Sequence, residues 1–247
     1  MAVFIYFLAG PRTPRAWTLL LTHDDCVATS SLPHEYLRPS AAPRSIYNAS
    51  MVSLLLGVLL AAGDPRLVDV ARLIPDSVVD MRYATADNFL HRKVYPVARC
   101  LLRRDVAERL AHAAARLRAE GYRLLLWDCY RPRSVQWEMW KLVTDTRYVA
   151  DPRRGSNHNR AAAVDLSLVT ADGRPVEMPT AFDSFEERAF AAAVEGVSQE
   201  AQQNRARLRR AMVAEGFRVR RTEWWHFDAS DAGSYPMLDE PLETAAQ

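Results

Sequence analysis

Residues 155–168 read GSNHNRAAAVDLSL, and this stretch predicts a buried strand that carries a polar group. From residue 163 to 169, apolar side chains alternate with small or polar ones, which places Asp165 on the face opposite the apolar residues. Burying an unpaired carboxylate is costly, so Asp165 needs a cation or several hydrogen-bond donors. His158 lies seven residues earlier, and neutral imidazole and carboxylate are both good zinc ligands. The spacing therefore indicates two of the three protein ligands of a zinc site, although a hydrogen-bonded structural pair is the more frequent explanation of such spacing alone.

The sequence around this stretch predicts an α+β domain that begins at about Leu67 and follows an N-terminal extension. The spacing of apolar residues, together with proline starts and glycine stops, predicts helices at 101–120, 132–143 and 199–215. Short apolar runs predict further strands at 123–127, 217–220 and 224–227. Ser184 with Glu187 forms a capping-box pattern, which predicts one more helix after residue 184.

Residues 222–228 read TEWWHFD and supply a third ligand and a general base. His226 completes the ligand set, and Glu223 lies three residues away, close enough to take a proton from a water at the metal. Residues three apart on an ideal strand face opposite sides, so Glu223 must lie at a bend, at a bulge or at the start of the strand. We expect at least one of Trp224 and Trp225 to be a packing residue.

Residues 124–132 read LLLWDCYRP and place Arg131 directly after a strand and before a helix. A guanidinium is permanently charged and its donors form a fixed fork, so Arg131 suits a developing oxyanion or a substrate carboxylate. The alternative is a structural arginine paired with Asp128. The sequence contains no H-E-x-x-H motif, which excludes the helical zinc site of thermolysin-type peptidases.

Five segments together resemble the signature set of the VanX-type D-alanyl-D-alanine dipeptidases. They are DMRYATADNF (80–89), WDCYRP (127–132), SNHNRAAAVDL (156–166), MPTAFD (178–183) and EWWHFD (223–228). These enzymes belong to a wider group of zinc peptidases that includes D,D-carboxypeptidases acting on cell-wall peptides. The resemblance runs from about Leu67 to the C-terminus. It implies a small α+β domain in which helices flank an antiparallel sheet that carries one zinc site.

The resemblance also implies a role for each candidate of the reaction centre. His158, Asp165 and His226 would be the ligands of one Zn²⁺ per chain. Glu223 would be the general base, and Arg131 would stabilise the tetrahedral intermediate.

The same resemblance suggests that Ser156, Tyr83 and Asp183 line the dipeptide pocket, with Asp183 facing the substrate ammonium. One departure from the family pattern lies nearby: a glycine usually stands three residues after the first histidine, and this chain has Ala161. If that position requires a positive φ, alanine costs about 1 kcal/mol or more and shifts the loop that carries His158.

Charge and hydropathy narrow the kinds of partner. The formal net charge is +2 and charges of both signs alternate, so the sequence offers neither a basic stripe for nucleic acid nor a polybasic tail for anionic lipid. No apolar run reaches the roughly 18 residues of a membrane-spanning helix. We therefore expect a small dipeptide as partner, no nucleic acid and no stable membrane insertion. The sequence gives no indication of oligomeric state.

Three functions fit these residues. The first is a metallodipeptidase that cuts free D-Ala-D-Ala. The second is a D,D-carboxypeptidase that trims peptidoglycan peptides, which differs in whether Asp183 and its loop block the amine end of the pocket. The third is a catalytically weak, zinc-containing module that binds peptidoglycan, suggested by Ala161. The intact Glu223 argues against the third function, because a binding module has no need of a base.

Residues 1–66 are interpreted as a leader or extension. Residues 51–65, MVSLLLGVLLAAGDP, have the apolar segment and small residues of a signal peptide, but the usual positive start is missing. One hypothesis is that Met51 is the true start, that cleavage falls near Ala62 and that the protein is periplasmic or secreted. The other is a buried helix that precedes the domain of a cytoplasmic protein.

Two cysteines bear on whether the protein is exported or cytoplasmic. Cys100 opens a predicted helix and Cys129 ends the strand that follows, so the two side chains can meet. A disulfide would fit an exported protein. Two buried thiols are the interpretation that we favour from the sequence.

Overall fold

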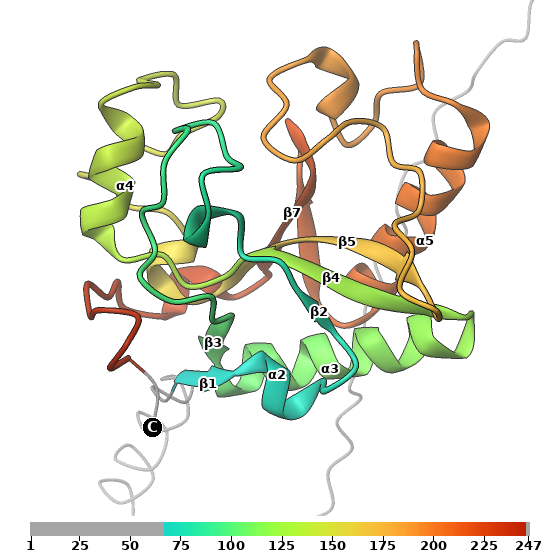
Figure 1. Cartoon of the computed structure of the whole chain (residues 1–247), viewed down its shortest axis with the longest axis horizontal. Coiled ribbons are helices and arrows are strands. Elements are labelled where there is room, and N and C mark those ends of the chain that lie inside the picture. The colour runs from blue at the N-terminus through green and yellow to red at the C-terminus, as the bar shows by residue number, and fades with distance from the viewer. Residues whose placement is uncertain (1–66, 246–247) are drawn as a thin grey trace, which may run out of the picture. The chain divides into compact units, whose positions relative to one another are not determined.

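The computed structural model describes residues 67–245, which have the expected α+β fold (Figure 1). The strands are β1 (Leu67–Asp69), β2 (Val78–Val79), β3 (Leu101–Arg103), β4 (Tyr122–Asp128), β5 (Ala163–Thr170), β6 (Phe217–Arg220) and β7 (Glu223–Ala229). The α-helices are α2 (Val70–Leu73), α3 (Arg104–Ala119), α4 (Arg133–Trp140) and α5 (Gln199–Ala214). Short 3₁₀ turns lie at Arg82–Ala84, His158–Arg160, Glu187–Ala189 and Ala232–Ser234.

A five-stranded sheet in the order β2-β4-β5-β7-β6 is the centre of the fold, and β1 pairs separately with β3. Neighbouring strands of this sheet run antiparallel except β2, which pairs in parallel with β4. The expected antiparallel sheet is thus confirmed at its centre and corrected at the β2 edge. The chain passes from β2 to β4 through a long crossover that contains α3, as a parallel pair requires.

The two faces of the sheet have different surroundings. Helix α3 lies along one side of the sheet and the long loops gather on the other (Figure 1). The apolar stripe of α3, which includes Val106, Leu110 and Leu117, is fully buried, and α5 packs beside this helix. Successive side chains of β5 point to opposite faces, so Val164 and Asp165 face different sides of the sheet. The polar face of β5 is therefore free to build a site beneath the loops.

The start of the predicted helix 101–120 is a strand instead. Leu101–Arg103 pair in antiparallel register with Leu67–Asp69, and both leucines are fully buried. Burial of two leucines in a strand pair outweighs helix propensity in the first turn, so α3 begins only at Arg104.

The helix predicted after Ser184 is also wrong. The Ser184 hydroxyl accepts a hydrogen bond from the Glu186 backbone, but only one 3₁₀ turn follows, at Glu187–Ala189. Phe190 then leaves helical geometry, and the Ala191 amide donates to the Arg221 carbonyl at 3.0 Å. A continuing helix would need that amide for itself. The tertiary hydrogen bond therefore ends the turn.

Cys100 and Cys129 form a disulfide, which corrects the preferred interpretation of two buried thiols. Both residues are fully buried, and their Cα atoms are 5.1 Å apart. The Tyr130 amide donates to the Leu101 carbonyl at 2.9 Å, so the backbone itself holds the two segments together. The disulfide ties the start of β3 to the end of β4.

The interpretations of Met51 and of residues 1–66 lie outside the described residues. Within residues 67–245, every helix is too short or too polar to cross a bilayer.

Candidate functional site

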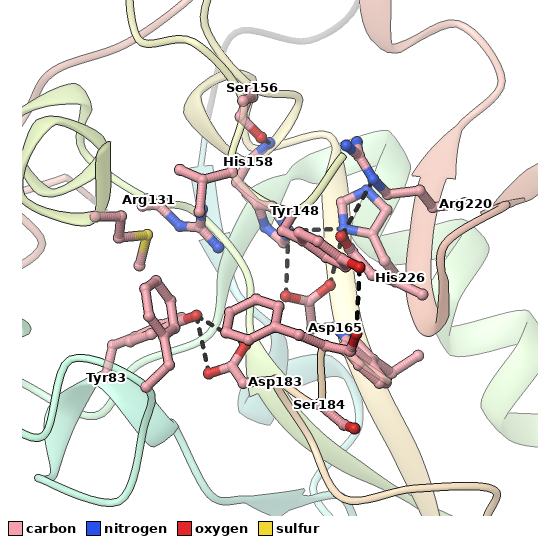
Figure 2. A pocket seen from close by; sticks show the side chains of 17 residues that line it. Tyr83, Arg131, Tyr148, Ser156, His158, Asp165, Asp183, Ser184, Arg220 and His226 are labelled. Carbon is pink, nitrogen blue, oxygen red and sulfur yellow. Dashed lines mark hydrogen bonds and ion pairs between the residues drawn. The ribbon is translucent and has the colours of Figure 1, made fainter. Parts of the chain in front are cut away.

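Three potential metal ligands meet on the polar face of the sheet (Figure 2). Asp165 on β5 lies directly opposite His226 on β7 in the strand register, so the sheet itself places this pair. His158 comes from the 3₁₀ turn that precedes β5. One ligand atom from each of the three residues lies within 4.8 Å of the others, and all three side chains are buried. The structure thus brings together the three ligands proposed from the sequence.

Backbone and carboxylate partners orient both imidazoles. His158 Nδ1 lies 2.7 Å from the Cys129 carbonyl, which assigns the proton to Nδ1 and leaves the lone pair of Nε2 facing the site. His226 Nε2 lies 2.9 Å from Asp228 Oδ1, which in the same way leaves the lone pair of Nδ1 facing the site. Such outer partners are the usual companions of metal-binding histidines.

The inner atoms of this group are not satisfied by one another. His158 Nε2 and His226 Nδ1 face each other at 3.1 Å, although both bear lone pairs in the tautomers assigned above. Asp165 Oδ1 lies 2.9 Å from His226 Nδ1, but without hydrogen-bond alignment, so this buried oxygen has no hydrogen-bond partner among the described residues. A cation between the three residues would resolve both conflicts. Two nitrogens and one carboxylate with a remaining open position are the donor set of a catalytic zinc site, so the residues fit the metal.

The charges around the group favour a cation as well. Burial opposes a positive charge on His226, but Asp228 and Asp165 outweigh it and raise its pKa well above the ordinary value. Burial likewise works to raise the pKa of Asp228, and the charge of His226 outweighs this effect and lowers the pKa to about 2. The surroundings therefore stabilise positive charge at this point of the sheet.

Glu223 is the first residue of β7, and a register shift lies opposite it between Val219 and Arg220. Of the three places expected for it, a bend, a bulge or the start of the strand, the structure shows the start of the strand beside a register irregularity. Its Oε2 lies 3.7 Å from His226 Nδ1, although the two residues are three apart. Burial raises the pKa of Glu223, partly offset by His226 and Arg220. A carboxylate beside the ligands with a raised pKa is suited to accept a proton from water near neutral pH.

Arg131 forms the ion pair with Asp128 that the structural interpretation predicted, while its role toward the substrate stays a prediction. Its Nε and Nη2 donate to Asp128 Oδ2 at 3.0 and 2.6 Å, and Nη1 donates to the Gln136 side chain at 2.9 Å. It also lines the cavity that contains the three ligands. Burial works against its charge, but Asp128 outweighs it and raises the Arg131 pKa well above the ordinary value. The guanidinium is therefore a fixed cation at the edge of the site.

The three predicted pocket residues line the same cavity. The Tyr83 hydroxyl lies 3.1 and 3.2 Å from the two Asp183 oxygens and donates to this carboxylate. Asp183 has φ 59°, and burial together with the charge of Asp165 raises its pKa to about 8. The Ser156 hydroxyl accepts a hydrogen bond from the His158 amide at 3.2 Å.

Ala161 follows the 3₁₀ turn of His158 with φ 55° and ψ 35°, the left-handed conformation. The positive φ considered for this position is therefore confirmed, and alanine adopts it here. The residue is fully buried, and its carbonyl accepts a hydrogen bond from the Arg103 amide at 3.0 Å. These contacts hold the turn in place, and His158 still reaches the ligand group.

Several residues of the cavity wall were not found from the sequence. Trp224 is a buried packing residue as expected, whereas Trp225 lines the cavity. Tyr148 and Phe185 also line it, with rings 4.8 Å apart, and lie in loops without a sequence pattern. Asp228, which orients the His226 imidazole, was missed as well. Its position two residues after His226, on the same face of the strand, is a sequence signal that could have identified it as the partner of this histidine.

The chain is similar to known peptidases over most of this domain. A family model described as D-ala-D-ala dipeptidase matches residues 64–245. The chain is 39% identical over 172 residues to the D-alanyl-D-alanine dipeptidase of Escherichia coli strain K12, covering 70% of this chain and 89% of the relative. It is 35% identical over 183 residues to that of Enterococcus faecalis strain V583, covering 66% and 86%. With that of Streptomyces coelicolor the identity is 31% over 186 residues, covering 67% and 91%.

Proposed function

Because this chain belongs to the D-Ala-D-Ala dipeptidase family, a family of hydrolases, we propose that it hydrolyses free D-alanyl-D-alanine to two D-alanines with one Zn²⁺. The observation that carries the proposal is the convergence of His158, Asp165 and His226 with Glu223 beside them. A zinc ion held by the three ligands would supply Lewis acidity, lowering the pKa of water and polarising the scissile carbonyl.

In this proposal Glu223 moves the proton. Its Oε2 is directed toward His226 Nδ1, so it borders the place where the attacking water must lie. It accepts a proton from that water and returns it to the leaving amine. Its raised pKa makes both transfers feasible near neutral pH.

Arg131 stabilises the developing oxyanion. Its ion pair with Asp128 and its hydrogen bond to Gln136 fix the guanidinium before the substrate binds. A preorganised cation in a site shielded from water stabilises charge without reorganising during the reaction.

Asp183, Tyr83 and Ser156 bind the ends of the dipeptide. Asp183 is the carboxylate for the substrate ammonium, and the Tyr83 hydroxyl holds it in place. Ser156 adds a hydroxyl on the His158 side of the cavity. An ammonium pairing with a carboxylate in the cavity wall favours a free dipeptide over a peptide whose amine is blocked.

We also propose that the protein functions in an oxidising compartment, outside the cytoplasm. The Cys100–Cys129 disulfide supports this location, because such bonds persist mainly in exported proteins. N-terminal sequencing of the native protein tests it. A mature end near Ala62 would support export, and an end well upstream of Met51 would contradict it.

The decisive experiment measures free D-alanine released by the full-length protein. The substrates are D-Ala-D-Ala and N-acetyl-D-Ala-D-Ala, each with and without a chelator, and Glu223→Ala is the control for contaminating peptidase. The proposal requires release from the free dipeptide that the chelator and Glu223→Ala both abolish. Preference for the blocked peptide would establish a carboxypeptidase instead, and zinc binding without release from either substrate would favour the binding module.

A further inference from the structure

Arg220 lies beside the general base and has no part in the steps described so far. It is the last residue of β6 and lies opposite Glu223, where the register of β6 and β7 shifts. It lines the cavity together with Arg131, the other arginine of the cavity wall. Figure 2 shows its guanidinium on the His226 side of the site.

Hydrogen bonds to two backbone carbonyls hold the Arg220 side chain against the loop at residues 146–147. Its Nη2 donates to the carbonyls of Thr146 and Arg147 at 3.3 and 3.2 Å. The Thr222 hydroxyl donates to the same Arg147 carbonyl at 3.0 Å, so the loop and the β6–β7 hairpin are joined twice. The guanidinium is therefore anchored to backbone that belongs to a different part of the wall.

The same guanidinium contacts Glu223. Arg220 Nε lies 3.3 Å from Glu223 Oε1, an ion-pair contact without hydrogen-bond alignment. The other oxygen, Oε2, is the one directed toward His226. Because the two oxygens belong to one planar group, a fixed cation at Oε1 also fixes the direction of Oε2. A glutamate without such a contact would be spread over several rotamers.

We propose that Arg220 is a positioning residue that holds the Glu223 carboxylate with Oε2 toward the reaction centre. The inference rests on the proposed function and adds to it a residue outside the quoted motifs. A role in binding the substrate carboxylate is less well supported, because Nη2, which both two-donor edges of the guanidinium share, already donates to two loop carbonyls. The fork that would grip a carboxylate with two donors is therefore not available.

The kinetic test compares variants of the full-length zinc enzyme on D-Ala-D-Ala. Arg220→Met keeps the length of the side chain and removes its charge, and Arg220→Lys restores a charge. Arg218→Met is the matched control, since Arg218 is an exposed arginine of the same strand. We expect Arg220→Met to lower kcat by about 10- to 100-fold with KM changed less than threefold, since a misplacement of about 1 Å can cost about 100-fold. Arg220→Lys should recover part of kcat, and Arg218→Met should equal the wild type.

A binding measurement separates positioning from substrate contact without turnover. In a Glu223→Gln background, calorimetry should give the same Kd for D-Ala-D-Ala with Arg220 and with Met at this position. Zinc affinity, measured by chelator competition, should also be unchanged.

Four outcomes would overturn the inference. For Arg220→Met on its own, they are a raised KM with unchanged kcat, or activity equal to that of the wild type. For the double variant, the outcome is a weaker Kd for D-Ala-D-Ala. The last is that Arg220→Met and Arg220→Lys lose activity to the same extent and both also lose zinc. A wild-type enzyme without turnover would overturn the proposed function and this inference together, whereas an active wild type with an unaffected Arg220→Met overturns this inference alone.

Discussion

The two sides of the cavity are built in different ways. On the sheet side, Asp165 and His226 are neighbours in a strand register, and backbone hydrogen bonds of β5 and β7 determine their separation. On the loop side, Tyr83 and Asp183 are a hundred residues apart in the sequence and meet only through their side chains. Strand registers fix atoms more narrowly than loop contacts do. The sheet side therefore suits the chemistry, and the loop side suits the choice of substrate.

The largest expected effect tests the sheet side. Glu223→Gln removes the proposed base but keeps the size of the side chain, so kcat on D-Ala-D-Ala should fall by roughly 10²–10⁴-fold, as for loss of a general base. KM and zinc content should change little. Steady-state kinetics and metal analysis of the purified variant measure both. A variant that keeps more than about a tenth of wild-type kcat would contradict the proposal that the sheet side carries out catalysis.

The next effect concerns the disulfide that stabilises the sheet side of the cavity. The Cys100–Cys129 disulfide closes a loop across 29 residues of sequence separation, and Cys129 also supplies the carbonyl that orients His158. The double variant Cys100→Ala/Cys129→Ala should lose about 3–4 kcal/mol of unfolding free energy, by chain entropy alone. Urea unfolding of the variant and of the wild type, oxidised and reduced, measures this loss. Reduced wild type should match the variant, and a loss below about 1 kcal/mol would show that the disulfide does not support this side.

The loop side is tested by Asp183→Asn. An amide cannot pair with an ammonium, so KM for the free dipeptide should rise by about 10- to 100-fold, the loss of a hydrogen bond to a charged group. The value of kcat should change much less. If kcat fell as strongly as in Glu223→Gln, the proposed division between the two sides would fail.

The same carboxylate predicts a pH dependence. With its pKa raised to about 8, Asp183 is protonated below that pH before substrate binds, whereas an ammonium binds the ionised form. Affinity should therefore improve as the pH rises toward 8. Metal on Asp165 would weaken the like-charge repulsion, so with zinc bound the improvement should end at a lower pH. Profiles of KM against pH should show this improvement in the wild type and lose it in Asp183→Asn, whereas the rise of kcat with ionisation of the proposed base Glu223 should remain in both.

The smallest effect concerns the turn of His158, which is the one proposed metal ligand that lies outside a strand. Ala161→Gly should raise the unfolding free energy by about 0.5–1 kcal/mol, because glycine relieves the left-handed strain but gives up a buried methyl group. Gly121→Ala is the converse control. Its φ is 84° with open space around it, so alanine there should cost about 1 kcal/mol from the backbone alone. A destabilised Ala161→Gly would show that packing outweighs strain in this turn.

The sequence predicted the features that depend on local pattern. The alternation at β5, the helical spacing of α3 and α5 and a closing strand at 224–227 could be predicted from neighbouring residues. The grouping of His158, Asp165 and His226 was proposed with the help of the family resemblance, and the structure brings them together, while their roles stay predictions.

The features that the sequence missed or did not favour depend on distant segments. The disulfide follows from the pairing of Leu101 with Tyr130, and the early end of the turn after Ser184 follows from a hydrogen bond to Arg221. Likewise, Arg220 approaches Glu223 only because the register shifts between β6 and β7. None of these contacts leaves a periodic signal in the sequence.

The pairing of Asp165 with His226 also bears on how the chain selects one pattern of strand alignment. A slip of β7 by one residue would turn His226 and Glu223 to the opposite face of the sheet. A metal that binds only the correct alignment would stabilise it over every slipped form, by an amount that grows with free metal concentration. In the proposed zinc enzyme, the metal would then favour the native strand alignment during folding, in addition to its role in hydrolysis.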